Sequence, residues 1–81
     1  MITVKVKLFS IVKESIGESF ILLNMKDNSR AKDVLHEIVK KNEDQLMGLP
    51  IRIAVNKSYV DGLFPLNDGD VVALIPPVSG G

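Results

Sequence analysis

The sequence predicts one α+β domain, in which a mixed β-sheet carries one main helix on one of its faces. Three observations support this class: a strictly alternating segment at the start, a single amphipathic helical stripe in the middle, and several short β-branched segments after it. They give the order ββαββ with a minor extra strand. Because one helix covers only one face of a sheet, the other face is expected to stay open.

The first strand is predicted from strict alternation over residues 2–9. One face carries Ile2, Val4, Val6 and Leu8, and the other carries Thr3, Lys5, Lys7 and Phe9. From this pattern alone, Phe9 either faces solvent and binds a partner or packs under residues 10–17, and the two alternatives carry equal weight.

A wide hairpin is predicted next. Ser10 is expected to cap a short helical turn over residues 11–15, which Gly17 ends before a second strand at residues 19–24. The main helix is expected to begin after residues 27–29 and to run to about Asn42. Its apolar stripe consists of Ala31, Val34, Leu35, Ile38 and Val39.

The second half of the chain predicts short strands separated by turns. Residues 51–55 are rich in β-branched side chains, and residues 59–60 return after a tight turn at Asn56-Lys57. A turn at residues 67–70 precedes the last strand, residues 71–75. The sequence thus predicts a domain over residues 1–75 and a flexible tail over residues 76–81.

Composition limits the classes of function. Ten basic residues balance ten acidic ones, so neither nucleic acid nor an anionic membrane is an expected partner. The longest apolar run, residues 71–75, is far too short for a signal or membrane segment, so we expect a cytoplasmic protein. The absence of cysteine excludes disulfides, thiolate metal sites and a cysteine nucleophile.

The side chains offer no active site. His36, the only histidine, is expected on the solvated side of the helix. Asp68 and Asp70 flank a turn glycine, but the later ligands of a calcium loop are absent, so we expect no metal. No serine has a plausible histidine and carboxylate set, and no phosphate-binding loop is present.

The last six residues read Pro-Pro-Val-Ser-Gly-Gly and carry the strongest functional signal. Because glycine has no Cβ atom, two final glycines allow a terminal carboxylate to enter a narrow enzyme channel. Pro76-Pro77 favours an extended, polyproline II backbone before them. The alternative is an ordinary frayed terminus.

These features together resemble one family, the small sulfur-carrying subunit of molybdopterin synthase (MoaD type, in the ThiS/MoaD group). The resemblance spans the whole chain and rests on Leu8-Phe9-Ser10 with Lys13-Glu14 and Gly17, Ala54-Val55-Asn56, Leu66 with Asp68-Gly69-Asp70, Val72-Ala73, and the end at residues 76–81. It implies a ubiquitin-like β-grasp fold, in agreement with the element order derived above.

The resemblance also implies a chemical cycle at Gly81. An E1-like adenylating enzyme (MoeB type) would activate its carboxylate with ATP, and a sulfur donor protein would convert it to a thiocarboxylate. The tail would then give this sulfur to cyclic pyranopterin monophosphate in the large subunit, forming the molybdopterin dithiolene. The chain would not be an enzyme by itself, would bind no cofactor, and would rely on catalytic side chains of the large subunit.

Binding residues follow from the same resemblance. Residues expected to thread into the partner's channel are Pro76, Pro77, Val78, Ser79 and Gly80, and residues expected to bind partners are Phe9, Lys13, Tyr59 and Ile75. Lys13 stands where the family usually has arginine, so a planar bidentate contact is in doubt there. The implied assembly is a heterotetramer of two small and two large subunits.

Three rival functions remain open at the level of sequence. The first is a sulfur carrier for thiazole synthesis in the thiamine pathway, which shares the fold and the adenylation chemistry. The second is a ubiquitin-like modifier, in which Gly81 would form an isopeptide bond with a lysine. The third is a plain interaction domain with an incidental tail.

Overall fold

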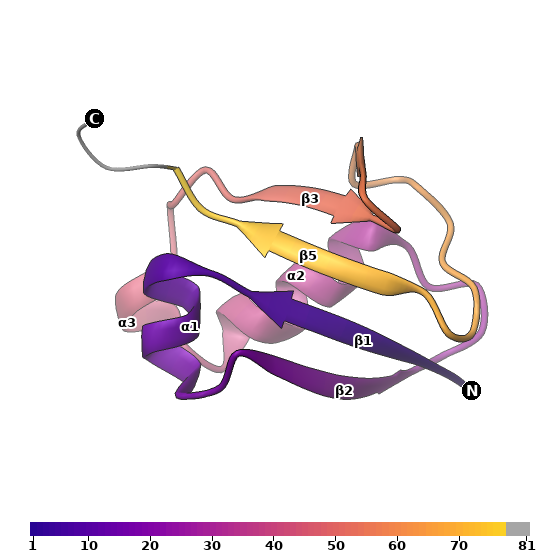
Figure 1. The fold of residues 1–81 in the computed structure, drawn as a ribbon, viewed down its shortest axis with the longest axis horizontal. Helices are drawn as coiled ribbons and strands as arrows, with labels where there is room; N and C mark the ends of the chain where they lie inside the picture. The colour runs from indigo at the N-terminus through magenta and orange to yellow at the C-terminus, as the bar shows by residue number, and fades with distance from the viewer. Residues whose placement is uncertain (78–81) are drawn as a thin grey trace.

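The computed structural model describes residues 1–77, which form a five-stranded mixed sheet with helices against one face (Figure 1). In sequence order the elements are β1 (Ile2–Leu8), α1 (Ser10–Ile16), β2 (Phe20–Met25), α2 (Ala31–Lys40), α3 (Glu43–Leu46), β3 (Arg52–Val55), β4 (Ser58–Val60) and β5 (Val71–Ile75). The strands lie in the order β2-β1-β5-β3-β4. This arrangement confirms the predicted α+β class and the β-grasp order.

The first two strands pair as the predicted hairpin. They run antiparallel, with Ile2 opposite Met25 at one end and Lys7 opposite Phe20 at the other. Between them, α1 ends at Gly17, whose φ of 86° is left-handed and whose N–H donates to the Lys13 carbonyl. This confirms the glycine stop, because residues with a Cβ rarely adopt that conformation.

The predicted cap of α1 at Ser10 is wrong. The N-cap position is held by Phe9, whose backbone is extended, and Ser10 is already the first helical residue. The Phe9 carbonyl accepts the N–H groups of Val12 and Lys13, at 3.1 and 3.3 Å. The helix therefore starts directly at the end of β1, and this placement fixes the backbone of Phe9.

The sheet is mixed because β5 lies between two partners of opposite direction. It runs parallel to β1, with Val6 opposite Val72, and antiparallel to β3, with Ala54 opposite Ala73. The last strand was predicted with its observed bounds, whereas β3 begins one residue later and β4 one residue earlier than predicted, and both end where predicted.

The main helix begins slightly later and ends slightly earlier than predicted. Its N-cap is Arg30, whose backbone N–H donates to the Asp33 side chain at 2.7 Å. Ser29, part of the predicted start signal, instead donates from Oγ to the Lys26 carbonyl. The helix ends at Lys40, and the separate turn α3, which the sequence analysis did not predict, buries Leu46.

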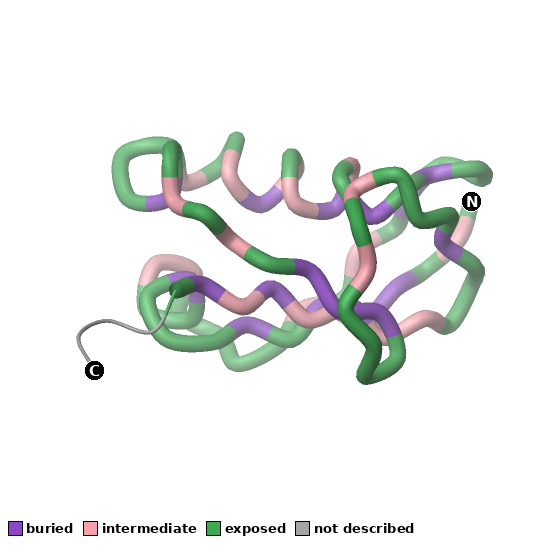
Figure 2. Tube along the Cα trace, turned by 90° about the horizontal axis from the view of Figure 1, so that it is seen from above, coloured by how far each residue is buried: buried purple, intermediate pink, exposed green. Residues whose placement is uncertain are grey.

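The core lies between α2 and the sheet. Figure 2 shows the helix as one layer and the strands as the other, with buried segments facing each other. Fully buried large side chains come from both layers, from α1 and from α3: Val4, Val6, Leu8, Val12, Val34, Ile38, Leu46, Val72 and Leu74. Within residues 1–77, no helix has the length and apolar character that crossing a membrane requires.

Candidate partner-docking surface beside the tail

The sheet face turned away from α2, which we call the outer face, carries an open groove. Strand register explains it: in a row across three strands, Ala73 of β5 lies opposite Ala54 of β3, which in turn lies opposite Tyr59 of β4. Two alanines side by side keep the floor low, while larger side chains rise around it. The groove has a volume of about 450 Å³ and is lined by Lys7, Phe9, Ala54, Asn56, Lys57, Tyr59, Val71, Ala73 and Ile75.

Three of the four predicted partner-binding residues meet in this groove. Phe9 is 44% exposed and Tyr59 is 58% exposed, while Ile75 is partly buried at the end of β5. The Arg52 guanidinium lies over the Tyr59 ring, 4.2 Å from its centroid, in a cation–π contact. Phe9 thus faces solvent on the outer face and does not pack under α1. Its role in binding remains a prediction.

Lys13 lies beside the groove and does not line it. It borders a neighbouring hollow on the outer face, together with Lys5, Lys7, Leu8, Phe9, Ser10, Ser19 and Phe20. Phe9 and Lys7 belong to both hollows. None of the described residues that line the two hollows is acidic, so the surface around Phe9 is apolar with a basic rim.

Asn56 is a groove residue whose contribution the sequence analysis missed. It and Lys57 have left-handed φ values of 49° and 75°, as a two-residue hairpin turn of type I′ requires. Its side chain donates from Nδ2 to Asp70 Oδ1 and accepts the N–H of Val71 on Oδ1, both at 3.0 Å. Asn56 therefore ties the β3–β4 turn to the start of β5. Its place in a predicted tight turn and in the Ala54-Val55-Asn56 motif were the sequence signals for it.

The two turn carboxylates have structural partners. Asp68 accepts the backbone N–H of Thr3 at 2.7 Å, and Asp70 accepts the N–H of Asn67 at 2.8 Å in addition to its bond with Asn56. These contacts hold the turn at Gly69 against the start of β1. His36 lies exposed on α2, on the other side of the sheet from the groove.

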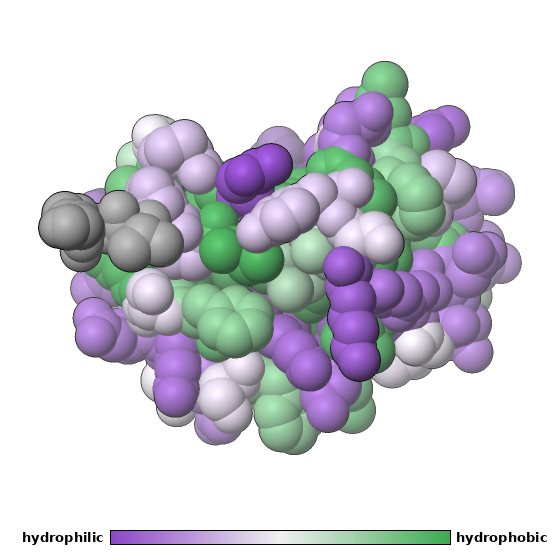
Figure 3. Space-filling model, turned by 45° about the horizontal axis from the view of Figure 1, so that its top comes forward, coloured by the Kyte–Doolittle hydropathy of each residue, from purple (hydrophilic) through white to green (hydrophobic). Residues whose placement is uncertain are grey.

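The chain leaves the sheet next to the groove. After Ile75, Pro76 is buried and Pro77 is exposed, and Figure 3 shows hydrophobic surface, interrupted by hydrophilic residues, close to the point where the tail departs. Predictions for Val78, Ser79, Gly80 and Gly81 lie outside the described residues. A partner bound in the groove would therefore also lie close to Pro76 and Pro77, where the tail begins.

Fold and surface together define a class of protein. A helix packed on one face of a five-stranded mixed sheet in the order β2-β1-β5-β3-β4 is a ubiquitin-like β-grasp domain. Its last strand passes beside an apolar groove, and the sequence that follows this strand reads Pro-Pro-Val-Ser-Gly-Gly. The ThiS family model matches residues 6–81, and the chain belongs to this family.

Individual relatives have more specific names. The chain is 33% identical to a molybdopterin synthase sulfur carrier subunit of Dictyostelium discoideum, over 95% of this chain and 94% of the relative. It resembles a Pyrococcus furiosus structure described as subunit 1 of molybdopterin converting factor, with a TM-score of 0.85 and 31% identity over 96% of this chain and all of that one.

A third relative was solved together with a partner. It belongs to a Helicobacter pylori complex of subunits 1 and 2 of molybdopterin-converting factor, with a TM-score of 0.68 and 32% identity. The match covers 99% of this chain and all of the Helicobacter pylori chain. In that structure, subunits 1 and 2 of the factor are bound to each other.

Proposed function

We propose that this chain is the sulfur-carrier subunit of a molybdopterin synthase and that it carries its sulfur as a thiocarboxylate on Gly81. The observation that carries the proposal is the full-length likeness to molybdopterin synthase sulfur carrier subunits, with a family match that runs through residue 81. The outer-face groove supports it, because the groove lies where β5 passes into the tail.

The chemistry would proceed in two steps at one carbon atom. In the first, the Gly81 carboxylate attacks the α-phosphate of ATP, forms an acyl-adenylate and releases pyrophosphate. In the second, the terminal sulfur of a donor protein's persulfide attacks the acyl carbon, displaces AMP and forms an acyl disulfide; a thiol then attacks the donor-side sulfur, forms a disulfide with it and releases the thiocarboxylate. Activation is required because a carboxylate is a poor acyl electrophile, whereas a mixed anhydride is a good one.

The domain's part in this cycle would be recognition. In the proposed complex, Phe9, Tyr59 and Ile75 contact the large subunit, and Pro76 to Gly80 lead Gly81 into its active site. The catalytic side chains that act on cyclic pyranopterin monophosphate would belong to the large subunit. An E1-like activating enzyme would recognise the same tail earlier in the cycle, so each partner must release the carrier before the next one binds.

The test has a chemical and a biological part. The chain is incubated with its E1-like enzyme, ATP and a sulfur donor, and its intact mass is followed; we expect the gain that corresponds to replacing one oxygen by sulfur. The matched control carries one extra alanine after Gly81 and should fold equally well but gain no sulfur. Sulfur gain by this control would show that Gly81 is not the acceptor.

The biological part separates the proposal from its rivals. The thiocarboxylated chain is offered to a molybdopterin synthase large subunit with cyclic pyranopterin monophosphate, and in parallel to a thiazole synthase with its substrates. Formation of molybdopterin supports the proposal. Sulfur transfer only to the thiazole precursor would contradict it, as would lysine conjugates formed in place of either product.

A further inference from the structure

Among residues 1–77, the sheet has one long edge without a partner strand. In the order β2-β1-β5-β3-β4, both β2 and β4 are edge strands, but β4 has three residues and β2 has six. Natural proteins commonly keep edge strands short or place charges on them, because an unpaired edge is a template for another strand. The short β4 follows that rule and β2 does not.

The unpaired backbone groups of β2 can be assigned from its pairing with β1. The Leu8 N–H donates to the Ser19 carbonyl at 2.9 Å, directly before β2. Because hydrogen bonding alternates along an antiparallel pair, Ile21 and Leu23 also direct their backbone groups toward β1. The residues between them, Phe20, Leu22 and Asn24, direct their N–H and C=O groups away from the sheet.

The same strand is apolar on both faces. Phe20 is 48% exposed and Leu22 is 65% exposed on the outer face, while Ile21 and Leu23 are partly buried on the helix side. The ammonium group of Lys5 lies 4.3 Å from the centroid of the Phe20 ring. The edge thus combines free hydrogen-bonding groups with exposed apolar side chains, the two features that favour strand addition.

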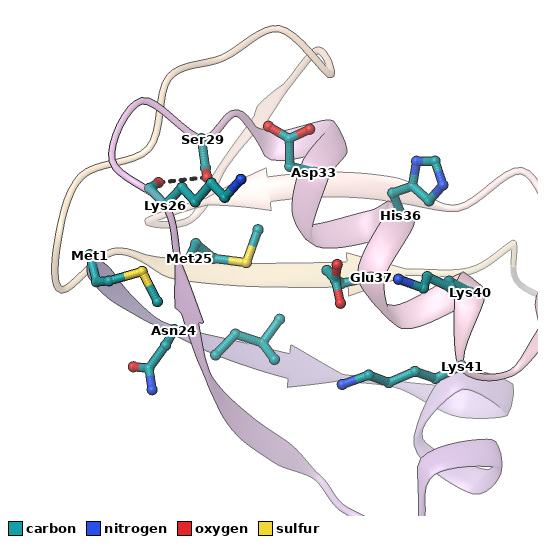
Figure 4. A pocket seen from close by; sticks show the side chains of 11 residues that line it. Met1, Asn24, Met25, Lys26, Ser29, Asp33, His36, Glu37, Lys40 and Lys41 are labelled. Atoms are coloured by element: carbon teal, nitrogen blue, oxygen red, sulfur yellow. Dashed lines mark hydrogen bonds between the residues drawn. The ribbon is translucent and has the colours of Figure 1, made fainter.

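A third hollow, of about 550 Å³, lies between β2 and α2 on the helix side of this edge. Charged residues line the helix side of this hollow. The acidic Asp33 and Glu37 come first along the chain, and the basic Lys40 and Lys41 follow. Figure 4 shows Asp33 and Lys41 toward opposite ends of this hollow. Because β2 leads into the start of α2 through a short connection, the acidic end of the wall lies beside the end of β2.

We propose that β2 is a self-association edge, on which a second copy of this chain adds its own β2 antiparallel, with Leu22 opposite Leu22 around a two-fold axis. In this register Phe20 faces Asn24 of the second copy, and the outward backbone groups of all three residues find partners. The two sheets then form one continuous sheet, and the Leu22 side chains contact each other on its outer face.

Charge pattern favours a second copy over an unrelated strand. The two-fold axis reverses the second α2, so the Asp33 end of one helical wall points toward the Lys40–Lys41 end of the other. The chain carries ten basic and ten acidic residues, so two copies approach without net repulsion. The interface is self-complementary in backbone register, apolar contact and charge.

The expected affinity is low. One added strand with few apolar contacts falls at the small end of specific interfaces, below about 1,200 Å², so we expect a dissociation constant between about 10 µM and 1 mM. The tail leaves from β5, which β1 separates from β2. Self-association therefore leaves the base of the tail accessible and does not depend on the proposed function.

The proposal is tested on the free chain by following its backbone amide NMR signals and its sedimentation over a concentration series up to about 1 mM. We expect the amides of Phe20, Leu22 and Asn24 to shift with concentration, while those of Ile21 and Leu23, already bonded to β1, shift less. A chain that stays monomeric over this range overturns the proposal. So does a dimer whose concentration-dependent signals lie elsewhere.

The sharpest variant is Leu22→Glu. Within one chain the new carboxylate lies opposite Lys5, which favours folding, whereas in the dimer it lies opposite its own copy. We expect the dissociation constant to rise at least tenfold. Leu63→Glu is the matched control, because Leu63 is similarly exposed, at 59%, in the loop after β4, and this change should leave association unaltered.

Mixing Leu22→Glu with Leu22→Lys completes the test. Only a symmetric register places residue 22 opposite residue 22, so the mixture should associate more tightly than either variant alone. Thermal unfolding of each variant confirms that the domain remains folded. The register is contradicted if Leu22→Glu associates as tightly as the wild type. It is also contradicted if the mixture associates no more tightly than either variant alone.

Discussion

The two faces of β1 differ in how far their side chains are buried. Toward α2, Val4 and Val6 are completely buried and Leu8 is 2% exposed; toward the outer face, Lys7 and Phe9 are exposed. Leu8 and Phe9 are neighbours in the chain, yet one belongs to the core and the other to the groove beside the tail. The comparison teaches that strand alternation separates the side chains of the core from those of the proposed docking surface, so stability and the proposed partner binding should respond to different substitutions.

The largest effect is expected on the buried face. Leu8→Ala removes a fully buried side chain and leaves a cavity, so we expect the free energy of unfolding to fall by about 2–5 kcal/mol. For a domain whose total is of the order of 5–15 kcal/mol, this is a large part of its stability. Urea unfolding measures it; a loss below about 1 kcal/mol would mean that the core tolerates this gap.

The outer face should respond in the opposite way. Phe9→Ala is expected to weaken binding to the large subunit by about 1–3 kcal/mol, because an exposed aromatic side chain is the kind of anchor on which interfaces depend. Its unfolding free energy should change little. Calorimetric titration and urea unfolding of the same protein measure both quantities. A strong loss of stability with unchanged affinity would place Phe9 in the core and break the comparison.

Asn56 connects the two roles and should have an intermediate effect on stability. Asn56→Ala removes two side-chain hydrogen bonds and a residue suited to left-handed φ, so we expect a loss of about 1–2 kcal/mol. The matched control is Asn28→Ala, since Asn28 also has a left-handed φ of 70° but makes no side-chain hydrogen bond within residues 1–77. Equal losses in both variants would show that the hydrogen bonds to β5 contribute nothing.

Lys13 should give the smallest effect. It is exposed in a hollow beside the groove, so Lys13→Ala is expected to weaken large-subunit binding by less than about 1 kcal/mol, more at low salt than at high salt. Lys13→Arg is the matched variant that keeps the charge and adds a planar, bidentate donor. If Lys13→Ala reduced affinity more than Phe9→Ala, the contact would be mainly ionic and the apolar groove secondary.

Local patterns were sufficient to predict much of the fold. Alternation identified β1, the 3.6-residue stripe identified α2, and the turn at residues 67–70 placed β5 with its observed bounds. The missed turn α3 has four residues and no periodic pattern that could have indicated it. The cap of α1 was misplaced because serine's preference for that position was overridden by the direct passage from β1 into the helix.

The groove could be predicted only in part. Phe9, Tyr59 and Ile75 were available from the family resemblance, but the floor depends on Ala54 lying opposite Ala73, a register between strands that are distant in the sequence. Likewise, Asn56 reaches Asp70 only because the β3–β4 turn folds against the start of β5. No local pattern encodes these contacts.

The measurement that tests the central claim most directly is purification of the untagged chain from its own cells under gentle conditions, followed by intact-mass identification of the proteins that co-elute. Our account predicts a molybdopterin synthase large subunit, retained by wild type and reduced with Phe9→Ala. Recovery of a thiazole synthase, or of a ladder of lysine conjugates without a large subunit, would contradict it.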